Sequence, residues 1–175
     1  MSAFKNELLL ALAKEHSIKN TMAIVGLINV EQKKFDVLMA IFFHGEYRAV
    51  QLASWVVGHC GEMHPNLLKK WMKPMLENLS NEVHDAVKRN TVRVLQDYKI
   101  PEELCGLAYD QCFILLQSTT EPIAVKVFAM QVLYNIVKDI PELKPELADA
   151  ISIQMPDGSA GLKNRGAKIL KKLGY

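Results

Sequence analysis

The sequence predicts an all-α fold, a right-handed α–α superhelix of about five antiparallel helix pairs. The first observation is a motif that recurs along the 175 residues at intervals of about 37 residues, a spacing typical of repeat proteins. The second is that Pro65, Pro101 and Pro141 each open a helical pattern, where proline is well tolerated. The third is that no stretch alternates apolar and polar residues as a strand would.

The clearest copy of the motif is an aliphatic residue, a base, a small residue and a second aliphatic residue: Val125, Lys126, Ala129 and Leu133. Residues three and four apart share one helix face, so the aliphatic positions predict a buried stripe. The small position predicts that a neighbouring helix lies close to it. The small positions of the other copies are Ser54, Thr91 and Gly166.

The base of the motif recurs in most copies, at Lys19, Lys88, Lys126 and Lys163. A lysine at the edge of a buried stripe can bury its stem and keep its charge near water or a carbonyl. Two interpretations remain open. These lysines either tie one repeat to the next, or they form a row that faces a ligand.

Periodicity and turn residues give the boundaries of the pairs within one domain, residues 1–175. The pairs are expected at residues 1–30, 31–64, 65–100, 101–140 and 141–175. Their helices are expected at 2–14 and 17–29, 31–44 and 46–63, 65–79 and 81–98, 101–117 and 121–139, and 141–154 and 159–173. Ser17 is expected to cap a helix, Gly45 to form a turn, and Pro74 to kink the helix that contains it.

Composition and charge restrict the classes of function. Half of the residues are hydrophobic but only 7% are aromatic, which favours aliphatic helix packing. The net charge of +2 is mild and does not demand a nucleic-acid partner, which usually requires a stronger basic surface. Three cysteines without an export signal predict reduced thiols and a cytoplasmic location, and no apolar run is long enough to predict a membrane span.

One cluster has the spacing of metal ligands. Cys60 and His64 are four residues apart, and His59 and His44 are nearby in the sequence. A metal site needs more ligands than this pair provides. No nucleophile motif or glycine-rich phosphate loop is present either. We therefore expect no metal, no cofactor and no catalytic residues.

The most regular second helix predicts which side chains line a groove, because second helices usually form the concave binding face of such repeats. Its buried stripe is expected to hold Val125, Ala129, Val132 and Ile136. Its opposite side is expected to hold Val127, Met130, Gln131 and Tyr134. The repeat offsets extend this side into two columns, Val56, Arg93, Gln131 and Lys168, and His59, Gln96, Tyr134 and Lys171. Trp55 and Arg89 are expected beside these columns.

An aromatic residue among bases can recognise a peptide or a nucleic-acid strand. The alternative is that Trp55 belongs to the core and that the bases form a solvated face. The last helix poses the same choice, since it holds five bases and no acid. It is either a polar cap on the end repeat or a basic contact surface.

The motif at residues 125–133 and its copies resemble the second helix of HEAT repeats over most of the chain. The segments at 48–60 and 124–139 also resemble a group of short bacterial HEAT-like proteins, some of which have been labelled adenylosuccinate lyase. The signature loop of those lyases resembles S-S-x-M-P-x-K-x-N-P, and the segment at 154–159 shares only Met155-Pro156 with it. HEAT-like DNA glycosylases are similar in scaffold, but no aspartate of this chain matches their catalytic residue.

These observations favour a non-catalytic scaffold that binds another protein or a peptide on its concave face. The alternative is nucleic-acid binding through a basic concave face, as the resemblance to the glycosylases implies. An adenylosuccinate lyase activity is the third hypothesis and has the least support in the residues.

Overall fold

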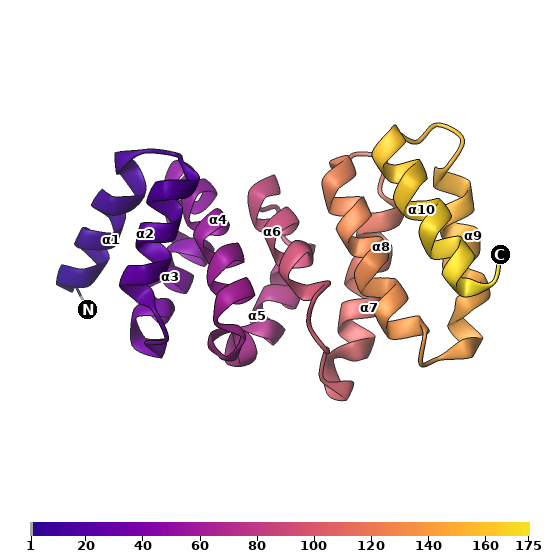
Figure 1. Cartoon of the computed structure of the whole chain (residues 1–175), viewed down its shortest axis with the longest axis horizontal. Coiled ribbons are helices and arrows are strands. Elements are labelled where there is room, and N and C mark those ends of the chain that lie inside the picture. The colour runs from indigo at the N-terminus through magenta and orange to yellow at the C-terminus, as the bar shows by residue number, and fades with distance from the viewer. Residues whose placement is uncertain (1) are drawn as a thin grey trace. The chain divides into compact units, whose positions relative to one another are not determined.

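The structure is a computed structural model that describes residues 2–175, and these residues form ten α-helices and no strand (Figure 1). This confirms the all-α helical-repeat prediction. The α-helices are α1 (Ser2–Lys14), α2 (Ile18–Ile28), α3 (Gln32–His44), α4 (Tyr47–Met63), α5 (Met72–Glu77), α6 (Asp85–Leu95), α7 (Glu102–Gln117), α8 (Ile123–Val137), α9 (Lys144–Gln154) and α10 (Ala160–Leu173). The 3₁₀ helices are η1 (Pro65–Trp71), η2 (Asn78–Ser80) and η3 (Pro141–Leu143).

We call α2, α4, α6, α8 and α10 the second helices, because each follows its partner in one of the five predicted pairs. The chain divides into two compact units. The N-terminal unit comprises residues 1–75 and 82–90, and the C-terminal unit comprises residues 76–81 and 91–175. The boundary between the units falls within α5, after Met75, and again within α6, after Asn90. The third predicted pair, which contains both helices, is therefore shared between the units.

The first half of the third pair differs from the expected kinked helix over residues 65–79. The segment begins as the 3₁₀ helix η1, and only Met72–Glu77 is α-helical. Pro74 therefore lies in the first turn of α5, where its missing N–H is not needed, and not inside a long helix. The partner helix α6 begins at Asp85, later than expected, and the His84 imidazole Nδ1 accepts a hydrogen bond from the Ala86 N–H at 2.9 Å.

In the N-terminal unit, α1, α2, α3 and α4 pack on one another, and η1 packs on α4. Large apolar side chains such as Leu8, Phe35 and Phe42 are fully buried there. Polar contacts fix η1 to α3: the Asp36 carboxylate accepts hydrogen bonds from Trp71 Nε1 at 2.9 Å and Lys70 Nζ at 2.6 Å, and the Gln32 amide donates to the Leu67 carbonyl at 3.1 Å. The carboxylate also accepts a bond from Gln32 on its own helix.

In the C-terminal unit, α8 is the central helix, since it packs against α7, α9 and α10 (Figure 1). The expected buried stripe is confirmed, because Val125, Ala129 and Val132 are 0% exposed and Ile136 is 7% exposed. A Cβ added to Gly166 of α10 would lie 2.6 Å from the Met155 sulfur, so α9 and α10 approach closely at that position.

The small positions of the motif are confirmed as buried in both units. Ser54 and Thr91 are fully buried, and the Ser54 hydroxyl donates a hydrogen bond to the Val50 carbonyl at 2.6 Å. The expected cap at Ser17 is also confirmed, and the structure shows a second serine cap that the sequence analysis did not predict. Ser17 and Ser159 cap α2 and α10 by accepting hydrogen bonds from Asn20 N–H and Leu162 N–H. Over the part of the chain that the structure describes, no helix combines the length and apolar character that a membrane crossing requires.

Candidate functional site: exposed faces of the second helices

The residues predicted to line a groove fall in both units. Trp55, His59 and Arg89 lie in the N-terminal unit. The others lie in the C-terminal unit: Arg93, Gln96, Gln131, Tyr134, Lys168 and Lys171. We therefore describe two surfaces, one in each unit, and a continuous groove through both stays a prediction.

In the N-terminal unit, Trp55 of α4 is half-buried and lies between two imidazoles. The ring of His16, from the turn before α2, meets it edge-on at a centroid distance of 4.9 Å. The ring of His59, one turn further along α4, has its centroid 5.8 Å from that of Trp55. Trp55 is thus only partly buried, and its role in binding a ligand stays a prediction.

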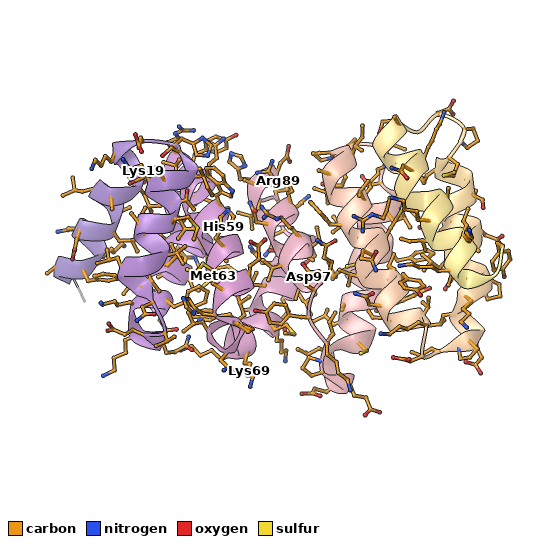
Figure 2. The ribbon with its side chains drawn as sticks, in the orientation of Figure 1. Lys19, His59, Met63, Lys69, Arg89 and Asp97 are labelled. Atoms are coloured by element: carbon orange, nitrogen blue, oxygen red, sulfur yellow. The ribbon has the colours of Figure 1, made fainter. Side chains whose placement is uncertain are left out.

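The His59 ring is fixed by its own helix. Its Nδ1 lies 3.0 Å from Glu62 Oε2, while its Nε2 is buried and has no hydrogen-bond partner among the described residues. Arg89 is exposed on α6 (Figure 2). The sequence did not predict the contact between His16 and Trp55, because His16 lies outside the repeated motif.

In the C-terminal unit, a chain of side-chain hydrogen bonds crosses the exposed side of α8. Arg165 of α10 donates to the Gln131 amide oxygen at 3.0 Å, and the Gln131 amide nitrogen donates to Asn135 at 2.9 Å. Asn135 in turn donates to the backbone carbonyl of Gln96 at 2.6 Å. Gln131 therefore belongs to a network that joins three segments, and Gln96 contributes to it through its backbone.

Tyr134 lies next to this network and is half-buried. The ammonium group of Lys172 is 5.2 Å from the centre of its ring, a cation–π distance. Lys168 and Lys171 are exposed, and within residues 2–175 neither forms an ion pair. We call the surface formed by Gln131, Tyr134, Asn135, Arg165, Lys168, Lys171 and Lys172 the α8–α10 face.

Two residues were assigned wrongly to the exposed side. Met130 is 0% exposed and Val56 is 1% exposed, so neither lines a groove. The reason is that several elements pack on each helix: α7, α9 and α10 pack on α8, which holds Met130, and α1, α2, α3 and η1 pack on α4, which holds Val56. The fixed repeat offset also pointed to Lys168 as the neighbour of Gln131, whereas the hydrogen bond comes from Arg165.

The lysines of the motif do not share one role. Lys126 is 8% exposed, and its ammonium group donates a hydrogen bond to Gln154 of α9 at 3.0 Å. It therefore ties the fourth pair to the fifth, as the scaffold interpretation predicts. Lys19 and Lys163 are exposed on α2 and α10, and Lys88 is half-buried.

Charge is segregated in the C-terminal unit. Together α8 and α10 carry six bases and no acid, whereas α7 and α9 carry five acids and one base. The same tendency holds for all the second helices, which carry eleven bases and two acids over their described lengths. The mild net charge of +2 thus conceals a strongly basic set of helices.

Two further features concern small-molecule and metal chemistry. Burial raises the pKa of the Cys60 and Cys112 thiols to about 12, so both remain protonated at neutral pH. Among the described residues, no group of three His, Cys, Asp or Glu side chains could hold a metal ion. An open pocket of about 880 Å³ adjoins the α8–α10 face, and its walls include Asn135, Ile136 and Ile140.

Comparison with known proteins gives one match. The model of the HEAT repeat domain matches residues 8–173, which is most of the chain. Neither the curated proteins nor the solved structures contain a match. HEAT repeats are typically non-catalytic scaffolds and often mediate protein interactions. With ten α-helices in its described residues, a repeated buried stripe and a match over nearly its whole length, the chain belongs to the HEAT repeat domain family.

Proposed function

We propose that this protein is a non-catalytic scaffold that binds another protein through the exposed faces of its second helices. The observation that carries the proposal is the α8–α10 face. Its polar side chains are held in place by hydrogen bonds between helices, although no ion pair within the described residues neutralises Lys168 or Lys171. Side chains that are ordered before binding lose less conformational entropy when a partner arrives.

The composition of the two surfaces also favours a protein partner. Each unit offers a half-buried aromatic ring, Trp55 or Tyr134, next to groups that can donate hydrogen bonds. Tryptophan, tyrosine and arginine are the residues most enriched in the energetic centres of protein interfaces. Both rings rest on packed helices, so their positions are set by the fold.

Nucleic-acid binding is the second candidate, and the basic second helices are the observation in its favour. Lysine and arginine side chains on one set of helices could neutralise phosphates and release counterions. One feature opposes it. Among the described residues, the α8–α10 face has a single aromatic ring, that of Tyr134, whereas single-strand binding usually uses several stacking rings.

Photo-cross-linking tests the proposal. Benzoylphenylalanine replaces Tyr134 or Trp55, and in matched controls it replaces Ile153 of α9 or Leu10 of α1, which are both 74% exposed. We expect discrete protein adducts from cell extract at Tyr134 or Trp55, unchanged by nuclease and absent from the controls. Equal adducts at the control positions, or adducts that nuclease removes, would contradict the proposal.

Salt dependence separates the two candidates. A labelled short DNA or RNA strand, titrated by fluorescence anisotropy, should bind weakly at physiological salt if the partner is a protein. If the second helices contact about six phosphates, affinity should instead fall by about a thousandfold between low and physiological salt. That steep dependence, together with tight binding at low salt, would favour the nucleic-acid candidate.

A further inference from the structure

We infer that the α8–α10 face is the docking surface for an acidic polypeptide segment that also carries an apolar side chain. This inference rests on the proposed function and names the chemistry of the partner. It starts from the charge segregation in the C-terminal unit, where the basic second helices α8 and α10 contrast with the acidic first helices α7 and α9.

The bases of α10 are spaced to meet an elongated partner. Arg165, Lys168 and Lys172 lie three and four residues apart, so they share one side of the helix and span about 10 Å along it. Arg165 and Lys172 are each held against α8, by Gln131 and by Tyr134 respectively. The row therefore lies along the junction of the two helices and is ready to meet carboxylates.

Lys168 and Lys171 of this face differ from two lysines of the N-terminal unit in having no acidic partner among the described residues. Lys34 and Lys70 are paired with Glu31 and Asp36 at 2.8 and 2.6 Å. Among the described residues, Lys168 and Lys171 have no such partner. An incoming carboxylate would thus find cations that no protein acid already neutralises.

Exposed ion pairs alone give little affinity, because each contributes well under 1 kcal/mol in most cases. The adjoining pocket provides the apolar contact that such a partner needs. It opens beside Asn135, has a volume of about 880 Å³, and includes Ile100, Ile136 and Ile140 in its walls. An apolar side chain at one end of the acidic segment would enter this pocket.

The same pocket disfavours a nucleic-acid strand. Its lining holds three acidic residues, Asp97, Glu102 and Asp139, and two basic residues, Lys99 and Lys138, so the pocket lacks the excess of bases that α10 carries. A uniformly charged phosphate backbone that followed α10 toward the end of α8 would meet these carboxylates. A polypeptide can place an uncharged residue there and keep its acids on the lysine row. We therefore favour an acidic polypeptide over nucleic acid.

The test uses the full chain and a defined probe. A fluorescein-labelled peptide of about 12 residues, built from repeats of Glu-Glu-Leu-Glu, is titrated by anisotropy. Two matched peptides replace every Glu by Gln, or every Leu by Gly. We expect the acidic peptide to bind, and each matched peptide to lose about tenfold or more in affinity. Equal binding of the Gln and Glu peptides, or no binding by the acidic peptide, overturns the inference.

Protein variants locate the site. Lys168→Glu with Lys171→Glu reverses two exposed charges of the face, and Lys5→Glu with Lys14→Glu reverses two exposed charges of α1 as the control. The first variant should bind the acidic peptide about tenfold more weakly or worse, and the control should change less than about twofold. Equal losses in both variants, or tighter binding of a DNA strand of equal length than of the peptide, overturn the inference.

Two measurements keep this inference separate from its alternatives. If wild type sediments as an oligomer and Lys168→Glu with Lys171→Glu sediments as a monomer, a second copy covers the face through its acidic α7 and α9, and the inference fails. If benzoylphenylalanine at Tyr134 still captures a protein in that double variant, the protein-binding function stands while the acidic-segment assignment fails. Loss of both capture and peptide binding in the double variant supports the inference.

Discussion

At the scale of single residues, Ala129 and Gln131 show how strongly two neighbouring positions of one helix can differ. Ala129 is 0% exposed at the small position of α8, so Ala129→Leu adds three carbons where no space exists. We expect it to lower the free energy of unfolding by about 1–3 kcal/mol. Urea denaturation measures this directly, and a stable Ala129→Leu variant would show that α8 has room at this position.

A substitution of Gln131 should affect stability more than its place on the outer side of α8 would suggest. Because it bonds to both Arg165 and Asn135, Gln131→Leu would leave two polar groups without a partner. We expect a loss of about 1 kcal/mol, which exceeds the effect of an ordinary surface change but remains below that of Ala129→Leu. If Gln131→Leu proves more damaging than Ala129→Leu, the network contributes more to stability than the close helix packing.

Asp36 gives a prediction about pH. Its partial burial raises the pKa of the carboxyl, but hydrogen bonds from Lys70, Gln32 and Trp71 outweigh this effect, so the pKa lies below its usual value of 3.8. A carboxylate with a lowered folded-state pKa stabilises the protein above the unfolded-state pKa, and this contribution is lost as pH falls through the folded-state value.

The matched variant is Asp36→Asn, which retains the size of the side chain but cannot ionise. At pH 7 we expect Asp36→Asn to be less stable than wild type by about 1 kcal/mol or more. The difference should begin to shrink as the pH falls below the unfolded-state pKa of about 4, and it should be lost as the pH falls through the lower folded-state pKa, where Asp36 becomes protonated in the folded protein. Thermal denaturation of both proteins between neutral and acidic pH checks this. A difference that does not depend on pH would show that charge plays no part in the contact.

At the scale of elements, Lys126 and Lys163 occupy equivalent positions of the repeat in different surroundings. Lys126 is buried and bonds to Gln154 of the next pair, whereas Lys163 is exposed on the last helix. Lys126→Ala should therefore cost about 1–2 kcal/mol through lost packing and a lost hydrogen bond. Lys163→Ala should change stability by about 0.5 kcal/mol or less.

Chemical denaturation of these two variants compares the repeat position with and without a following pair. Equal effects would mean that the bond from Lys126 to Gln154 does not contribute to the stability of the folded chain. A larger loss at Lys163 would mean that the last helix depends on its bases for stability, which the scaffold interpretation does not predict.

The elements also show what the sequence could predict. The buried stripe of α8, the small positions and the cap at Ser17 depend on local sequence, so spacing and residue type identified them. The segment of η1 has the apolar spacing of an α-helix, and its 3₁₀ geometry could not be inferred from that spacing. The geometry of a short helix depends on the residues it packs against. For η1 these include Asp36, which binds Lys70 and Trp71.

The candidate site was less predictable than the fold, because it depends on contacts between repeats. The helix phase located Gln131 and Tyr134 on the exposed side, but Met130 was placed there too, since the crowding around α8 is not visible in the sequence. The partners Arg165 and Lys172 come from another helix, at separations that differ from the repeat length. The sequence pointed to the last helix only through its five bases and lack of acids, which left both a polar cap and a basic contact surface open.

At the scale of the whole molecule, the arrangement of charge matters more than its total. A chain with a net charge of +2 places most of its helical bases on the second helices and divides acids from bases within the C-terminal unit. Under the proposed function, a negatively charged partner would be attracted to the face formed by α8 and α10 and repelled by the acidic helices α7 and α9. In a repeat scaffold such a bias selects a binding face without altering the packed core.

The most direct measurement of this claim is a nuclear magnetic resonance titration of the isotope-labelled full chain with the acidic peptide. Amide shifts should change at Gln131, Tyr134 and Asn135 on α8 and from Arg165 to Lys172 on α10. Amides near the pocket, including Glu102 and Cys105 at the start of α7, should also change, whereas those of Asp110, Glu146 and Asp149 on the acidic surface of α7 and α9 should not. Shifts that cluster on this acidic surface, or that are confined to the N-terminal unit while the peptide binds, would contradict the account.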